Sequence, residues 1–96
     1  IEKTYELSRE GLSIKEIAKA RNLATSTITG HLESLIKDGR DVAIDRLIDP
    51  VKRNTIEEMF LTLKTWHTAP IVENSNGTIS YDDAKLVRAY VQQKQS

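Results

Sequence analysis

The stretch SIKEIAKARNLATSTITGHL, residues 13–32, decides the fold of this chain. Ser13 followed by Glu16 is a capping box, in which each side chain satisfies a backbone N–H of the first turn, so a helix begins at the residue after the serine. Asn22 tolerates the left-handed conformation that a tight exit needs, and a second helix begins at Thr25. The stretch therefore predicts two short helices joined by a tight turn.

Apolar residues recur at three- and four-residue steps along both predicted helices and define a buried side for each. In the second helix these residues are Ile28, Leu32, Leu35 and Ile36. Leu23 is expected to fill the space beneath the turn, and Gly39 to end the second helix. The opposite side of the second helix is then predicted to show Ser26, Thr29, Gly30, Glu33 and Lys37.

A further helix is predicted before this motif. Residues 1–10 can form a helix that Gly11 ends, because glycine readily adopts the conformation that closes a helix. We expect Ile1, Tyr5 and Leu7 to be its buried side chains.

The second half of the chain is also predicted to be helical. Asp49-Pro50 is a good N-cap followed by the favoured first-turn proline, which predicts a helix over about residues 50–65. A short helix or turn is expected over residues 66–72. A last helix is expected to begin after Ser80 and to fray near Gln92.

The segment between the two halves leaves its structure open, because Val42 and Ile44 alternate with polar neighbours too briefly to predict a strand. A rudimentary wing and a helix start are both compatible with it. The predicted fold class is all-α, with about five to six helices. We expect one domain over residues 1–96, made of a helix-turn-helix half over 1–48 and a C-terminal helical half over 49–96 packed on it. The expected core residues are Ile28, Leu32, Leu35, Phe60, Leu63, Trp66, Val87 and Tyr90.

The composition is that of an ordinary globular domain. Lys and Arg (14) balance Asp and Glu (14), so no overall field draws the chain onto nucleic acid or an anionic membrane. No apolar run approaches the roughly 18 residues of a membrane span, and no signal peptide is visible, so we expect a cytoplasmic protein. The chain opens at Ile1 rather than Met, and we expect it to be part of a longer protein.

The sequence offers no catalytic centre. The chain contains no cysteine, and it lacks the Gly-x-x-x-x-Gly-Lys-Ser/Thr pattern that cradles the phosphates of ATP. His31 and His67 have no partners at metal-ligand spacing, and adjacent carboxylates on a helix diverge by about 100°. We therefore expect a chain that is not itself an enzyme and that has no metal site and no cofactor.

Short polar and basic residues around the second helix of the motif are the candidates for contacting DNA. In such motifs the second helix lies in the major groove, and its N-terminal residues approach the base edges. Hydroxyl groups there can donate to phosphates, and flanking cations can neutralise them. The candidate residues are Thr25, Ser26, Thr29, Lys15, Lys19, Arg21, Lys37 and Arg40. Because Glu16, Glu33 and Asp38 share these helices, binding should be weak and have little sequence preference.

Two aromatic residues and a second basic cluster have simpler explanations. Trp66 and Tyr81 could stack on unpaired bases, but in a chain with few large apolar residues we interpret them as structural. Lys85 and Arg88 form a small basic cluster, which we interpret as a solvated helix surface.

Two resemblances follow from these motifs. Residues 16–32 resemble, at unbroken spacing, the helix-turn-helix of bacterial response-regulator output domains. Across nearly the whole chain, however, the sequence resembles the helix-turn-helix domain at the C-terminus of many bacterial RecQ-family DNA helicases. The segments that carry this second resemblance are Leu35-Ile36-Lys37-Asp38-Gly39, Asp41 to Ile48 before Pro50, Pro70-Ile71 and Thr78-Ile79-Ser80-Tyr81-Asp82-Asp83-Ala84-Lys85-Leu86-Val87-Arg88-Ala89-Tyr90.

The resemblance to RecQ-family helicases implies an accessory role in DNA repair and recombination. In that family the ATP- and Mg-dependent engine lies upstream, and this domain would bind DNA or other domains of the parent helicase. A protein–protein docking module stays open as an alternative, because many helix-turn-helix modules are docking scaffolds. The DNA-binding domain of a transcription regulator is a further alternative, although such regulators do not need the extra half from Asp49 onward.

Overall fold

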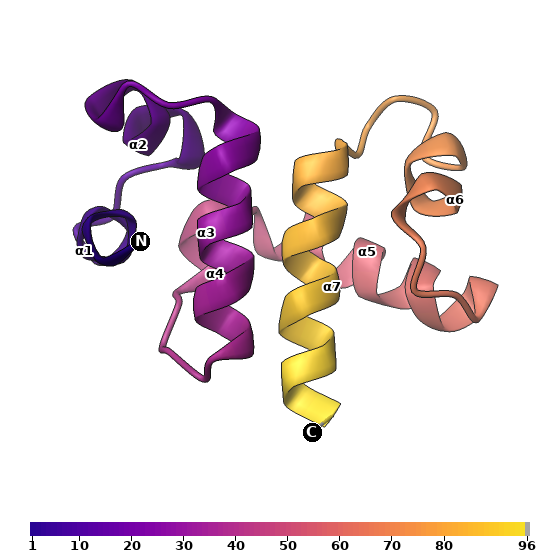
Figure 1. Ribbon diagram of the computed structural model, residues 1–96. Helices are drawn as coiled ribbons and strands as arrows, with labels where there is room; N and C mark the ends of the chain where they lie inside the picture. Colours follow the sequence, from indigo (N-terminus) through magenta and orange to yellow (C-terminus); the bar gives the residue numbers. More distant parts are fainter. Residues whose placement is uncertain (96) are drawn as a thin grey trace.

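The computed structural model describes residues 1–95, which fold into α-helices joined by short connections (Figure 1). The seven helices in this part of the chain are α1 (Glu2–Arg9), α2 (Ile14–Arg21), α3 (Thr25–Lys37), α4 (Ile44–Leu47), α5 (Pro50–Leu63), α6 (Thr68–Glu73) and α7 (Tyr81–Gln95). No strand occurs within residues 1–95, so the all-α prediction is confirmed. The helix count exceeds the prediction because of the single turn α4. Since α4 begins at Ile44, the helix start is correct and the alternative of a wing is wrong.

Local capping explains where α2 begins and ends and where the turn to α3 lies. The Ser13 hydroxyl accepts a hydrogen bond from the Glu16 backbone N–H (3.2 Å), and the Glu16 carboxylate accepts one from the Ser13 N–H (2.8 Å). These two bonds are the predicted capping box. Asn22 follows α2 with a φ of 57°, the left-handed conformation that the tight turn requires. The predicted helix–turn–helix geometry is therefore confirmed.

The helices of the second half also begin at their predicted caps. The Asp49 carboxylate accepts hydrogen bonds from the backbone N–H groups of Val51 (3.0 Å) and Lys52 (3.2 Å) at the start of α5. The Ser80 hydroxyl accepts one from the backbone N–H of Asp83 (3.1 Å) at the start of α7. α7 does not fray where predicted and continues to Gln95.

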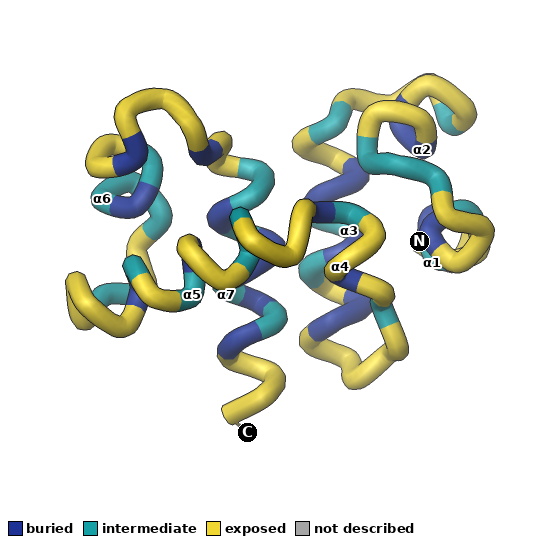
Figure 2. The backbone as a smooth tube through the Cα atoms, turned by 180° about the vertical axis from the view of Figure 1, so that it is seen from behind, coloured by how far each residue is buried: buried dark blue, intermediate teal, exposed yellow. Residues whose placement is uncertain are grey.

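α3 and α7 form the centre of the fold and join the two halves of the chain. They lie side by side, and α4 and α5 pass behind them (Figure 1). α1 and α2 pack on the side of α3 away from α7, and α6 packs on α7. Buried segments occur in both halves (Figure 2). The largest fully buried apolar side chains are Ile17, Ile28, Leu32, Ile56, Ile71, Leu86 and Val87. One hydrophobic core therefore runs through both halves.

Two of the predicted core residues are in fact exposed. Leu63 is 41% and Trp66 is 40% exposed, because the chain after Phe60 reaches the edge of the fold, where residues 61–64 are all exposed (Figure 2). The Trp66 ring still packs on Phe60, which is buried, and their ring centroids lie 5.6 Å apart. Tyr90 is half-buried, and the other predicted core residues are buried.

The predicted inner face of α1 is correct only in part, because Tyr5 and Leu7 are half-buried against the core. Ile1 is exposed, and Thr4 and Ser8 take the buried positions. The Thr4 hydroxyl forms hydrogen bonds with Arg21 of α2 and His31 of α3, and these bonds determine which side of α1 faces the core. Leu23 is exposed as well, so it does not fill the space beneath the turn.

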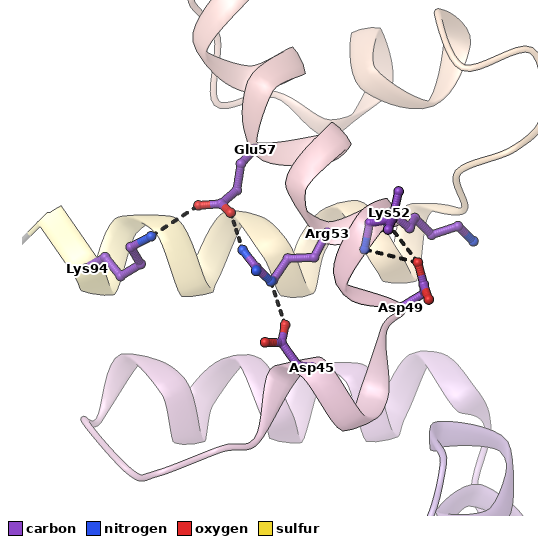
Figure 3. A network of polar contacts seen from close by, with 7 residues as sticks. Asp45, Asp49, Lys52, Arg53, Glu57 and Lys94 are labelled. Atoms are coloured by element: carbon purple, nitrogen blue, oxygen red, sulfur yellow. Dashed lines mark hydrogen bonds and ion pairs between the residues drawn. The ribbon is translucent and has the colours of Figure 1, made fainter.

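An ion-pair network joins α4, α5 and α7 (Figure 3). Arg53 donates to Asp45 of α4 (2.6 Å) and to Glu57, one turn along α5. Glu57 also pairs with Lys94 of α7 (3.4 Å), and the Arg53 guanidinium lies 5.4 Å from the centroid of the Tyr90 ring. The hydrogen bond to Asp45 raises the pKa of Arg53 above its ordinary value. The charges of this network are therefore paired with one another.

Candidate nucleic-acid interface

One side of α3 faces solvent, and short side chains cover most of it. The other side consists of Ile28, Thr29, Leu32, Leu35 and Ile36, which are buried. The solvent-facing side, called here the outer face of α3, consists of Ser26, Thr27, Gly30, Ser34 and Lys37. All of these are exposed except the half-buried glycine. Because four of the five have no more than three side-chain heavy atoms, a partner can approach the helix backbone closely.

Gly30 lies in the middle of this face, where the backbone has no need of glycine. A positive φ favours glycine, but the φ of Gly30 is not positive. A Cβ added to Gly30 would meet no atom within 4 Å. Glycine inside a helix costs about 1 kcal/mol relative to alanine. A destabilising residue at the centre of an exposed face is the arrangement expected where a partner comes close to the backbone.

Thr29 does not belong to the outer face, so its predicted contact with DNA is wrong. The residue is 1% exposed, and its hydroxyl has no hydrogen-bond partner among the described residues. It lies seven positions before the buried Ile36 and therefore on the same side of the helix. Because α7 packs along α3, the buried side is wider than the apolar residues alone predict.

The first turn of α3 is open. Its N-cap residue is Ala24, which has no side-chain acceptor for the first N–H groups, whereas Ser13 caps α2 and Asp49 caps α5. Thr25, which is half-buried, and Ser26, which is exposed, therefore present hydroxyl and backbone N–H groups at the positive end of a helix. Both residues lie where the sequence predicted an approach to DNA.

Lysines without an ion pair among the described residues lie at both ends of α3. Lys15 and Thr25 line the same hollow of about 420 Å³ at the start of the helix. Lys37 is exposed in its last turn. At 1.5 Å per residue, the two ends of α3 are about 18 Å apart. Lys19 is exposed on α2. The structure thus places predicted cations at the two ends of the outer face and on the preceding helix.

The two predicted arginines are instead engaged with α1. Arg40 donates to both carboxylate oxygens of Glu2 (2.7 and 3.2 Å), and its guanidinium lies 4.3 Å from the centroid of the Tyr5 ring. This hydrogen-bonded pair raises the pKa of Arg40 and lowers the pKa of Glu2. Arg21 donates to the buried hydroxyl of Thr4 (2.8 Å). Both arginines have a structural role here, and their contact with DNA stays a prediction.

Both edges of the outer face are tied to neighbouring helices. Glu33 pairs with Arg88 of α7 (3.6 Å), so the acid nearest the outer face is neutralised. On the other edge, His31 Nδ1 lies 3.0 Å from the Thr4 hydroxyl of α1. Burial, together with the nearby charge of Arg21, lowers the pKa of His31 below its ordinary value.

α7 presents a second solvent-facing stripe on the same side of the molecule. Because α4 and α5 lie behind both α3 and α7, the outer sides of the two helices point the same way (Figure 1). The residues on this side, called here the outer face of α7, are the exposed Tyr81, Gln92 and Gln95 and the half-buried Lys85 and Arg88. From the sequence we interpreted Lys85 and Arg88 as a solvated surface. Their helical spacing from Tyr81 is the signal that joins them into one stripe.

The described residues show neither a metal centre nor a membrane-spanning helix. Within residues 1–95, no three side chains of histidine, cysteine, aspartate or glutamate come together in a way that could hold a metal ion. No helix in this range is long and apolar enough to cross a membrane.

Comparison with known proteins identifies the family of the chain. No curated protein and no solved structure shows significant similarity to it. A family described as a helix-turn-helix domain matches residues 1–88, which includes α1 to α6 and the first half of α7. The match therefore extends well beyond the two short helices and their turn, and it carries no link to RecQ-family helicases. The chain belongs to this family of helix-turn-helix domains.

Proposed function

We propose that this chain is a non-catalytic DNA-binding module that contacts the major groove of duplex DNA through the outer face of α3. Membership in a helix-turn-helix family supports DNA binding, because such domains commonly insert the second helix of the motif into that groove. The observation that carries the proposal is the outer face itself. Gly30 lies at the centre of this face among short polar side chains, and the first turn of α3 has no side-chain cap. Lys15 and Lys37, which have no ion pair within residues 1–95, lie at the two ends of α3.

The distribution of exposed apolar residues favours DNA over protein as the partner of α3. The outer face of α3 contains no apolar side chain larger than a threonine methyl group. Leu23, in the turn before α3, is 37% exposed, whereas three exposed large apolar residues lie together in the chain at the end of α5: Leu61, which is 62% exposed, Leu63 and Trp66. This end of α5 supports a second role, as a contact with another protein domain.

We place this module in a RecQ-like, ATP-dependent helicase that acts in DNA repair and recombination. The support is the resemblance of residues 35–90, above all the segment from Thr78 to Tyr90. In that setting ATP and Mg belong to the parent enzyme, and this chain needs no cofactor. The gene that encodes the chain is then expected to encode a phosphate-binding loop as well, and its full sequence tests this placement.

The expected affinity follows from the available charges. Lys15, Lys19 and Lys37 can neutralise about three phosphates, which gives a slope of roughly −3 in a plot of log affinity against log salt concentration. Binding no tighter than about micromolar is expected at physiological salt. Such binding is useful when the module is tethered to an enzyme that already holds DNA, because tethering raises the effective concentration.

The test is fluorescence anisotropy with a labelled blunt duplex at low and physiological salt. The double variant Lys15→Glu/Lys37→Glu should lose most of the affinity, because it places negative charges at both ends of α3. The matched control is Arg46→Glu/Lys64→Glu, which changes the net charge equally at α4 and at the end of α5. That control should bind nearly as well as the wild type.

Circular dichroism and melting should be unchanged in both double variants, because all four side chains are exposed. The proposal is wrong if the wild-type chain does not bind duplex DNA at low salt. It is also wrong if the two double variants bind equally well.

A further inference from the structure

Tyr81 differs from every other aromatic side chain of the chain. Phe60 and Trp66 pack on each other, with ring centroids 5.6 Å apart. The Tyr5 ring lies under Arg40, and the Tyr90 ring lies near Arg53 and Lys94. Tyr81 is 48% exposed, and within residues 1–95 it has no ring, cation or hydrogen-bond contact. Its ring is therefore available to a partner.

The position of Tyr81 relates it to the proposed DNA contact. It is the first residue of α7 and lies on the outer face of that helix, which points the same way as the outer face of α3. Its neighbours Ser80 and Asp82 line the hollow that Lys15 and Thr25 also line. Tyr81 therefore lies near the N-terminal end of α3, beside the surface that is proposed to contact the duplex.

A positively charged side chain, that of Lys85, lies near the Tyr81 ring in the sequence of α7. Lys85 lies one turn further along the outer face of α7 and has no ion pair among the described residues. Of the two acids next to Tyr81, Asp83 is paired with Lys52 (3.1 Å), and Asp82 shares its hollow with Lys15 and Lys52. A phosphate attached to a base on the ring could thus meet Lys85, and Asp82 is the neighbouring acid for which no ion pair is seen within residues 1–95.

We infer that Tyr81 is a stacking platform for an unpaired nucleotide base and that Lys85 contacts the backbone of the same strand. The inference rests on the proposed duplex contact of α3 and adds a preference to it. The module binds a duplex that continues into a single strand more tightly than a blunt duplex. Every base has a π-face, so this preference is largely independent of sequence. It also explains why a half-exposed aromatic ring has no partner within the fold.

The experiment compares two labelled substrates, a blunt duplex and the same duplex with a short single-stranded overhang, by anisotropy at low salt. The measured quantity is the overhang preference, the Kd for the blunt duplex divided by the Kd for the overhang duplex. We expect a preference of about fivefold or more for the wild type. Tyr81→Phe should keep it, because the ring remains. Tyr81→Ala should reduce it to about one, while binding of the blunt duplex changes little.

Leu61→Ala is the matched control, because it truncates an exposed side chain at the far end of α5 and should leave the preference unchanged. A wild-type preference near one, or an undiminished preference in Tyr81→Ala, overturns the inference. If the wild type binds the overhang duplex but not the blunt duplex, the proposed duplex contact of α3 fails, and the stacking role of Tyr81 stands only if Tyr81→Ala abolishes binding of the overhang duplex. If it binds neither substrate, both fail.

Discussion

The front and the back of the α3–α7 pair differ in how their positive charges are paired, although Arg88 on the front is paired with Glu33. On the front, Lys37 and Lys85 are without ion pairs among the described residues. On the back, facing α4 and α5, Arg53 is paired with Asp45 and Glu57, and Lys94 is paired with Glu57 as well (Figure 3). A chain with zero net charge can therefore present cations on one face, because many of its acids are paired elsewhere. Net charge alone is a weak argument against DNA binding for such a domain.

The largest effect should come from a substitution that breaks the ion-pair network on the back. Arg53→Met removes a largely buried guanidinium and leaves the largely buried Glu57 carboxylate without it, and we expect the variant to lower the free energy of unfolding by about 1–2 kcal/mol. Lys37→Met, on the front, should change it little, because an exposed charge without a partner contributes little to stability. Urea denaturation of the two variants measures both values. Equal losses would mean that the two faces do not differ.

A smaller effect of opposite sign is expected on the front. Gly30→Ala should raise the free energy of unfolding by about 0.5–1 kcal/mol, because alanine favours the helix and the added methyl group meets no atom. The same variant should weaken DNA binding, because the methyl group stands between the backbone of α3 and its partner. Thermal denaturation and anisotropy measure the two effects.

Asn54→Ala is the control for this variant. It lies at an exposed position of α5 and should stabilise that helix by a similar amount without changing DNA binding. A Gly30→Ala variant that is stabilised and binds DNA as well as the wild type would show that DNA does not approach the backbone of α3 closely at Gly30.

The smallest effect concerns the edge where α3 meets α1. The pKa of His31 is lowered in the folded state, so between its unfolded value and its folded value the unfolded chain binds the extra proton. The stability associated with His31 is thus fully present above its ordinary pKa of 6.5 and is lost as the pH falls below that value. His31→Asn keeps an acceptor for the Thr4 hydroxyl but does not titrate. Melting between pH 7.5 and about 5 should therefore fall less steeply in the variant than in the wild type. Parallel curves for the two proteins would contradict this assignment.

Secondary structure was predictable because its signals are local. The capping box at Ser13, the left-handed Asn22 and the Asp49-Pro50 cap all form within a few residues, and each lies where the sequence predicted it. The buried residues of α3 were predicted for the same reason, except for Thr29. The pattern fixed the direction of the buried side, but its width depends on α7, which follows more than forty positions later in the chain.

The site was predictable only in part, because contacts between distant residues decide which charges and rings are available. Thr25, Ser26, Lys15 and Lys37 lie around α3 as expected. Arg40, however, is held by Glu2, a residue 38 positions away, and no local pattern shows that pairing. Trp66 and Tyr81 were both interpreted as structural, yet only the first packs on another ring.

The sequence by itself determined the helices, their caps, the turn between α2 and α3 and the absence of a phosphate-binding loop, because each depends on neighbouring residues or on composition. Only the tertiary structure decided which side of α3 is open, which basic residues are already paired and that α7 lies beside α3 with its outer face pointing the same way. The physical reason is that burial and ion pairing depend on distances in space. Those distances are set when segments far apart in the chain pack into one core.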